Sequence, residues 1–240
     1  MAATSLRRGD KGAAHMTRTT NARIAGFTFL FYIAVGVAAM VLFGRATEGE
    51  GMAAKLASIA QHATYVRLTV ILTLLAGFCA LVLAVTLYAI TRDEDPDLAL
   101  LAMTCRVAEG ITGIFVASTL GLLWLATATG TDAPDTAAAR ALGAFLLRME
   151  AWSPGAIFFA VGSTIFSWLL LRGRMIPVAL ARLGVFASVL LVVILPLQLV
   201  GLAGGWVTTF MWLPALVFEL ALALWLLVKG VAAPGRRQSA

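Results

Sequence analysis

An arginine and a glutamate three residues apart interrupt an otherwise apolar stretch of the chain. Arg106 and Glu109 are the only charged residues between Leu98 and Ala126. On a helix this spacing puts both side chains on one face, where they can form an ion pair. A charge near the centre of a membrane-spanning helix costs about 2.5–3.5 kcal/mol on insertion scales. Both groups must therefore face other helices or a wet cavity.

A second glutamate lies at a matching depth in a distant part of the chain. Glu219 precedes Val228, the end of the last apolar run, by nine residues, or roughly 14 Å of helix. Arg106 and Glu109 lie roughly 12 and 16 Å along their own helix from Leu98. If both helix ends face the same side, the sequence predicts one buried cluster with a formal charge of minus one. It is either a structural network that fixes helix register or a site for a proton, a cation or a polar ligand. Two carboxylates that share one arginine favour a proton on one of them.

A weaker group of polar side chains is expected toward the opposite side of the membrane. It consists of His62, Arg67, Arg148 and Glu150, together with Tyr65. The sequence leaves open whether these residues form a secondary site or are solvated residues of the interface.

The composition indicates the elements that must position these groups. The chain of 240 residues is 61% hydrophobic and 12% charged, whereas soluble domains carry about 25% charged residues. The sequence therefore predicts an all-α, polytopic membrane helix bundle spanning residues 21–229. Six apolar runs are long enough to span a bilayer: 24–43, 68–90, 98–126, 155–171, 176–200 and 206–228.

The segments between and beyond these runs carry further signals. Residues 52–66 have apolar side chains at a helical period, which predicts a short interfacial helix before the second span. Residues 137–152 fit either a second interfacial helix or part of a long, kinked fourth span. Residues 1–20 are interpreted as a disordered cytoplasmic tail and residues 230–240 as another tail. Whether Met1 or Met16 is the native start stays open.

The distribution of basic residues predicts the orientation. With both termini inside, twelve arginines and lysines fall on the cytoplasmic side and five on the other, as the positive-inside rule requires. The net charge of +6 is thus explained by basic loops and tails, and we expect no nucleic-acid partner.

The sequence lacks the residues that several kinds of membrane-protein chemistry require. The two histidines, His15 and His62, lie outside the six runs, which argues against haem ligation by two histidines in the membrane. No zinc-protease motif occurs. Cys79 and Cys105 have no metal-ligand spacing and are expected to be buried free thiols. We therefore expect no metal and no cofactor.

Short motifs resemble those of a known family. They are Ala22-Arg23-Ile24-Ala25-Gly26, Arg106-x-x-Glu109, Ile157-Phe158-Phe159 with Gly162, and Ile176-Pro177 followed by Leu183-Gly184. Their order and spacing resemble the DUF4386 family of six-span bacterial membrane proteins. The resemblance implies six helices in a bacterial inner membrane, but it brings no established activity or site residues.

The leading functional hypothesis is a non-enzymatic membrane protein that binds or transports a small solute, an ion or a lipid. Arg106 would be the anchor, and Glu109 and Glu219 would be the exchangeable acids. Six-span carriers often work as dimers, so a homodimer is one expectation. One rival is a structural or regulatory membrane protein whose buried charges only fix helix packing. A membrane enzyme acting on a lipid-borne substrate is a less favoured third hypothesis.

Overall fold

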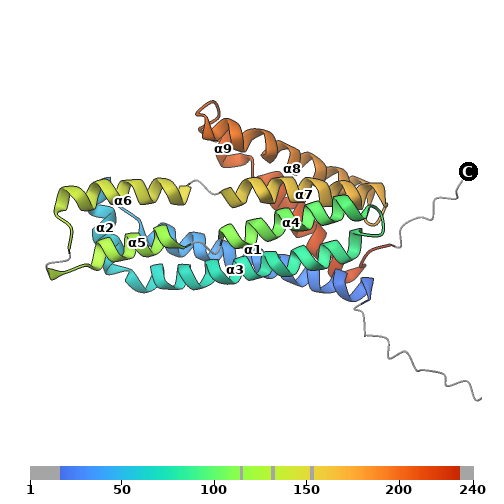
Figure 1. Cartoon of the computed structure of the whole chain (residues 1–240), viewed down its shortest axis with the longest axis horizontal. Coiled ribbons are helices and arrows are strands. Elements are labelled where there is room, and N and C mark those ends of the chain that lie inside the picture. Colours follow the sequence, from blue (N-terminus) through green and yellow to red (C-terminus); the bar gives the residue numbers. More distant parts are fainter. Residues whose placement is uncertain (1–16, 114–115, 131–132, 152–153, 233–240) are drawn as a thin grey trace, which may run out of the picture.

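The computed structural model describes residues 17–113, 116–130, 133–151 and 154–232, and within these ranges the secondary structure is helical, with no strand. Figure 1 shows most of the helices running along the long direction of the molecule. The helices are α1 (Arg18–Ala46), α2 (Gly51–Gln61), α3 (Ala63–Thr91), α4 (Pro96–Gly113), α5 (Ala117–Thr127), α6 (Thr136–Ala151), α7 (Pro154–Arg172), α8 (Val178–Leu199), α9 (Trp206–Phe210) and α10 (Leu213–Val228).

Six helical stretches are long and apolar enough to cross a membrane, as predicted. Their main helices form a ring in sequence order, in which α1, α3, α4, α7, α8 and α10 each pack against the next, and α10 returns to α1. Each span therefore presents one face to the centre of the ring and another outward. This closed order allows residues of α1, α4 and α10 to meet although they lie far apart in the sequence.

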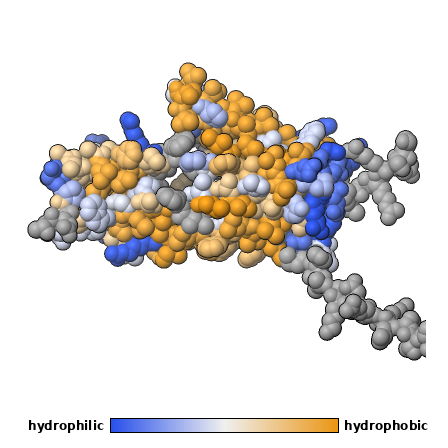
Figure 2. All heavy atoms as spheres, in the orientation of Figure 1, coloured by the Kyte–Doolittle hydropathy of each residue, from blue (hydrophilic) through white to orange (hydrophobic). Residues whose placement is uncertain are grey.

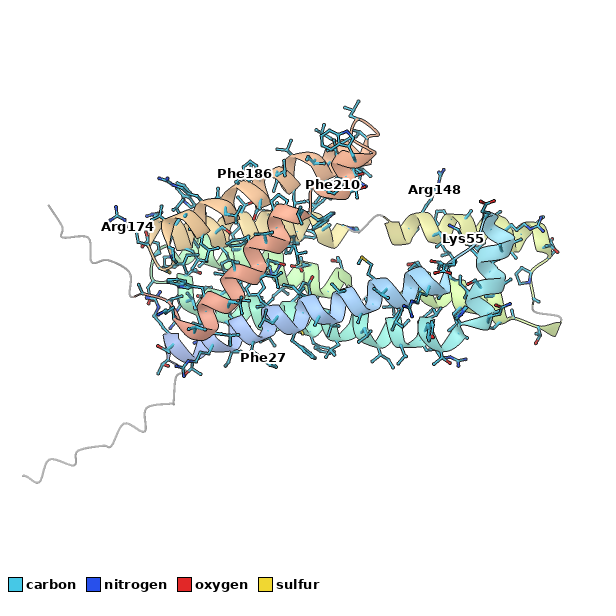
Figure 3. All side chains as sticks on the ribbon, turned by 180° about the vertical axis from the view of Figure 1, so that it is seen from behind. Phe27, Lys55, Arg148, Arg174, Phe186 and Phe210 are labelled. Atoms are coloured by element: carbon cyan, nitrogen blue, oxygen red, sulfur yellow. The ribbon has the colours of Figure 1, made fainter. Side chains whose placement is uncertain are left out.

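The ring has two chemically different ends, which we name the charged end and the far end. Figure 2 shows hydrophilic residues gathered at the end where α1 begins and α3 meets α4, beside a broad hydrophobic band. Arg174, labelled in Figure 3, lies at this charged end, whereas Lys55 and Arg148 lie at the far end. The far end is built from α2, α5 and α6 (Figure 1).

The first helix begins earlier than predicted. The Thr17 side chain accepts a hydrogen bond from the Thr20 backbone amide at 3.1 Å, which caps the helix that starts at Arg18. Residues 18–20 are thus helical, and the predicted tail over residues 1–20 was wrong at this boundary. The rest of that tail, up to residue 16, lies outside the described residues.

The short helix predicted over residues 52–66 is present but ends earlier, and its place at the membrane interface stays a prediction. It is α2, which ends at Gln61 and lies crosswise to its neighbours in both views (Figures 1 and 3). The second span then begins at Ala63 instead of residue 68. The apolar side chains Met52 and Ile59 of α2 and Val66 of α3 pack together in one cluster. The helical spacing of these residues in the sequence therefore did not reveal where α2 ends and α3 begins.

Residues 137–152 correspond to α6, which runs along α5 in the direction of α7 and does not lie crosswise as α2 does (Figure 1). The Asp135 side chain caps this helix by accepting a hydrogen bond from the Ala138 amide at 2.8 Å. The geometry therefore favours the long fourth span over a second interfacial helix.

The sixth predicted span is interrupted, since it divides into α9 and α10 around Met211 and Trp212. The third is described as α4 and α5, and residues 114–115 between them lie outside the described residues. Pro214 stands in the first turn of α10, where a missing amide hydrogen is tolerated. The continuous apolar run over residues 206–228 did not reveal this division.

Candidate functional site

Arg106 and Glu109 form an ion pair inside the ring. Arg106 Nη1 lies 2.8 Å from Glu109 Oε2, and only 1% of the arginine and 7% of the glutamate surface is exposed. The contact is close but lacks aligned hydrogen-bond geometry, and Nε and Nη2 of Arg106 have no hydrogen-bond partner among the described residues. The guanidinium is therefore almost fully desolvated and is compensated mainly by charge.

Tyr32 of α1 completes the surroundings of Glu109. Its hydroxyl donates a hydrogen bond to Glu109 Oε1 at 3.0 Å, so each carboxylate oxygen has its own partner. Tyr32 lies fourteen residues after Arg18, or roughly 21 Å along α1, near the depth of the ion pair. Tyr32 was not predicted from the sequence. Its distance along the helix was the only feature that could have indicated its place beside the ion pair.

Glu219 of α10 occupies the same central region but has no such partners. It is 8% exposed, and no hydrogen bond or ion pair reaches it from the described residues. It interacts electrostatically with Arg106 and Glu109. Its side chain also lines two cavities, a larger one and a small one. The structure thus brings Arg106, Glu109 and Glu219 together and distinguishes a fully partnered glutamate from an unpartnered one.

The larger cavity extends from the two glutamates toward the far end, with a volume of about 690 Å³. Its deepest polar residues are buried, whereas Met40 at its margin is 68% exposed, so the cavity reaches the surface. Residues near the described helix ends contribute to its wall. They are Gly113 at the end of α4, Gly155 near the start of α7, Thr209 of α9 and Trp212 between α9 and α10.

The space on the other side of Glu219 is nearly filled. The cavity there, beside Arg106, Ser163 and Ser167, has a volume of about 10 Å³, about enough for one water molecule. Phe29, Phe166, Phe218 and Leu222 line this small cavity and belong to one packed hydrophobic core. The cluster therefore borders the larger cavity on its far-end side and a packed core on its charged-end side.

Phe159 of α7 separates Arg106 from the larger cavity. Its ring lies over the guanidinium, with the centroid 5.1 Å from Arg106 Cζ. It also contacts Trp212, with ring centroids 6.0 Å apart. Phe159 and Trp212 both line the cavity, whereas Arg106 does not. A molecule in the cavity thus meets aromatic rings and carboxylates rather than the positive charge.

Comparison with known proteins gives a family and no activity. A family model described as a domain of unknown function, DUF4386, matches residues 24–230. The chain belongs to the DUF4386 family. The match covers the ring, the ion pair and Glu219. No curated protein and no solved structure matches the chain.

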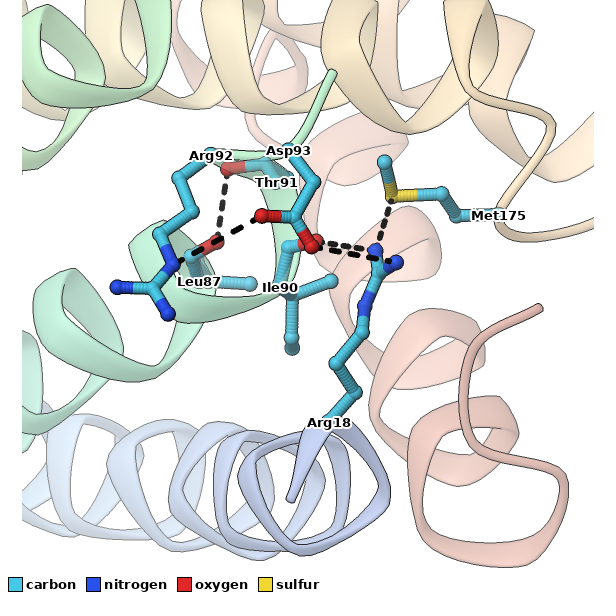
Figure 4. A network of polar contacts seen from close by, with 7 residues as sticks. All are labelled: Arg18, Leu87, Ile90, Thr91, Arg92, Asp93 and Met175. Atoms are coloured by element: carbon cyan, nitrogen blue, oxygen red, sulfur yellow. Dashed lines mark hydrogen bonds and ion pairs between the residues drawn. The ribbon is translucent and has the colours of Figure 1, made fainter. Parts of the chain in front are cut away.

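The charged end of this DUF4386 protein is closed by polar contacts, some of which Figure 4 shows. Arg18 donates hydrogen bonds to the Ile90 carbonyl and to Met175 Sδ, and it lies 3.8 Å from Asp93. Arg172 pairs with Glu94 at 2.9 Å and with Asp95 at 3.2 Å. These contacts connect α1, α3, α7 and the turn before α4.

Among the described residues, the secondary group predicted from sequence shows one contact between its members. His62 and Tyr65 do stack, with ring centroids 5.3 Å apart. Arg67 and Arg148 are exposed and make no ion pair or hydrogen bond within the described residues, and Arg148 projects away from the bundle in Figure 3. The Glu150 side chain lies outside the described residues.

Proposed function

We propose that this integral membrane protein binds a small amphiphilic ligand in the larger cavity and carries it across the membrane. The observation that carries the proposal is the unpartnered, buried Glu219 at the bottom of a cavity of about 690 Å³. Ligand sites in proteins are mainly apolar cavities of roughly 300–1,000 Å³ with a few convergent polar groups. Glu219 is the group that exchanges partners, whereas the Arg106–Glu109 pair, held by Tyr32, is the fixed part of the site.

Two features support a carrier rather than a static binding protein. The cavity lies on the far-end side of the cluster, while the charged-end side is filled by a packed core and joined by ion pairs around Arg18 and Arg172. Its wall also includes Thr209 and Trp212 at the interruption between α9 and α10, an arrangement typical of substrate sites in secondary transporters. The positive-inside rule puts the charged end in the cytoplasm, so this conformation is open to the outside.

The rival proposal is a structural protein in which the buried charges only fix helix register. It explains the Arg106–Glu109–Tyr32 contacts, because each of these groups has a partner. It does not explain why a third ionisable group, Glu219, is buried without one, since an unpaired polar group in an apolar region is destabilising. A ligand or a proton at Glu219 removes that difficulty.

Native mass spectrometry of the purified protein tests the proposal. Ala156 lines the cavity, so Ala156→Trp puts an indole ring into it, whereas Val193 on α8 is 53% exposed and Val193→Trp serves as a matched control. We expect a retained small molecule on the wild type and on Val193→Trp, and none on Ala156→Trp.

Two results would contradict ligand binding in this cavity. One is an adduct that remains on Ala156→Trp at the wild-type level. The other is a wild-type protein that carries no adduct and gains no thermal stability in a small-molecule extract of the membrane fraction.

A further inference from the structure

The charges that border the larger cavity indicate which ligand it accepts. Arg106 and Glu109 of α4 and Tyr32 of α1 interact electrostatically with Glu219. From α7, Phe159 lines the larger cavity, and Ser163 and Ser167 line the small one. One arginine and two glutamates leave a charge of minus one when both glutamates are ionised. A single positive charge, on a ligand or as a proton, neutralises the site.

The arrangement excludes an anion as the preferred ligand. Arg106 is 1% exposed, is covered by the Phe159 ring and does not line the larger cavity. An anion entering from the far end would meet the two carboxylates before any positive group. Coulomb repulsion in a site with little water is strong, so an anion is disfavoured.

The walls indicate an organic cation rather than a metal ion. Three aromatic side chains, Tyr32, Phe159 and Trp212, line the cavity beside Glu109 and Glu219. Aromatic faces attract cations by about 0.5–2 kcal/mol each when the cation lies over the ring. The remaining wall is mostly alanine, glycine, leucine and methionine, which cannot replace the water around a small inorganic ion but packs well against an apolar body.

We infer that the ligand is a monovalent organic cation with an apolar body, which replaces a proton on Glu219. This inference depends on the proposed ligand-binding function of the cavity. When the cation binds, the O–H bond of the Glu219 carboxyl breaks, the proton leaves to water through the open side, and the carboxylate pairs with the cation. The charge of the site is zero before and after the exchange, so no uncompensated charge is buried at either stage.

Equilibrium binding of two ions of the same shape and opposite charge tests the inference. The probes are radiolabelled tetraphenylphosphonium and tetraphenylborate, added to the purified protein in an uncharged detergent, with tetraethylphosphonium as a smaller cation. We expect saturable binding of a phosphonium cation, one per chain, and no saturable binding of the borate. Below the pH at which Glu219 is half protonated, affinity should fall about tenfold per pH unit, as competition with a single proton requires.

Variants separate the role of Glu219 from the stability of the fold. Glu219→Gln should lower cation affinity at least about tenfold, and Glu219→Asp should retain part of it, because the charge remains. Glu48→Gln is the matched control, since Glu48 is exposed and outside the cavity. Each variant is first checked for a monodisperse elution profile.

The outcomes distinguish this inference from the proposed function. If the borate binds as well as the phosphonium ions, or if phosphonium binding survives Glu219→Gln but is lost in Ala156→Trp, the cavity binds ligands but the assignment of a cation is wrong. If neither cation binds saturably to the wild type, the inference is wrong. A retained ligand that Ala156→Trp removes would still support the proposed function in that case.

Discussion

The two halves of the helix ring differ in how the space between the helices is filled. Between the cluster and the charged end, large side chains such as Phe166, Phe218 and Leu222 form a continuous core. Toward the far end the same ring encloses a cavity of about 690 Å³. The contrast follows from helix continuity in the sixth span, because α10 runs unbroken to the charged end and is separated from α9 toward the far end. A break in a helix removes the regular packing surface that its neighbours would fill.

The charged residues also differ between these regions, in whether they have a partner of opposite charge. At the charged end and in the ion pair, Arg18, Arg172, Arg106 and Glu109 each have a close partner of opposite charge. Glu219 lies at the boundary between the halves and has none among the described residues. Stability and ligand binding are therefore assigned to different residues, and substitutions can test that separation.

The largest expected effect comes from removing the arginine at the boundary. Arg106→Ala leaves Glu109 buried without its ion-pair partner and Glu219 without a nearby positive charge, which we expect to lower the free energy of unfolding by about 3–5 kcal/mol, as for other broken buried ion pairs. Thermal unfolding in detergent measures the loss. Arg67→Ala is the control, because Arg67 is exposed and unpaired within the described residues, and it should change little.

A compensating variant sharpens this prediction. Adding Glu109→Gln and Glu219→Gln to Arg106→Ala removes the uncompensated charges and should recover part of the lost stability. An Arg106→Ala protein as stable as the wild type would show that the cluster does not depend on its arginine.

A smaller change in stability should distinguish the two halves of the ring when two glycines of one helix are replaced by alanine. Gly26 and Gly36 both lie on α1, but a Cβ at Gly26 would lie 2.7 Å from the Ala223 carbonyl oxygen of α10, whereas a Cβ at Gly36 would meet no atom within 4 Å. Gly26→Ala should therefore cost about 1–3 kcal/mol through overpacking. Gly36→Ala should be neutral or stabilising by up to about 1 kcal/mol, because alanine favours the helix. Equal melting temperatures for the two variants would contradict the tight packing assigned to the charged half.

The sequence predicted the parts of this structure that depend on depth and charge. The six spans follow from the length of apolar runs, and the meeting of Arg106, Glu109 and Glu219 follows from their distances along the helices. Tyr32 and the cavity could not be predicted in this way. A tyrosine in an apolar run has no charge to mark it, and the cavity depends on helix breaks and on which helices are neighbours in the ring. Arg148 was grouped with His62 because the direction in which it projects from α6 cannot be read from the length of the loops.

The central claim, that the cluster is reached from the far end and closed toward the charged end, can be tested by thiol labelling. Thr73→Cys and Ser167→Cys are compared in a background in which Cys79 and Cys105 are alanine. Thr73 lines the larger cavity roughly 15 Å along α3 from its far-end start, whereas Ser167 lies beside the small cavity, roughly 8 Å from the charged end of α7. If only the distance from the nearer end of the bundle decided reactivity, Ser167→Cys would react faster with a water-soluble maleimide than Thr73→Cys. We predict the reverse, with rapid labelling of Thr73→Cys and protection of Ser167→Cys, and equal protection of both thiols or faster labelling of Ser167→Cys would contradict this account.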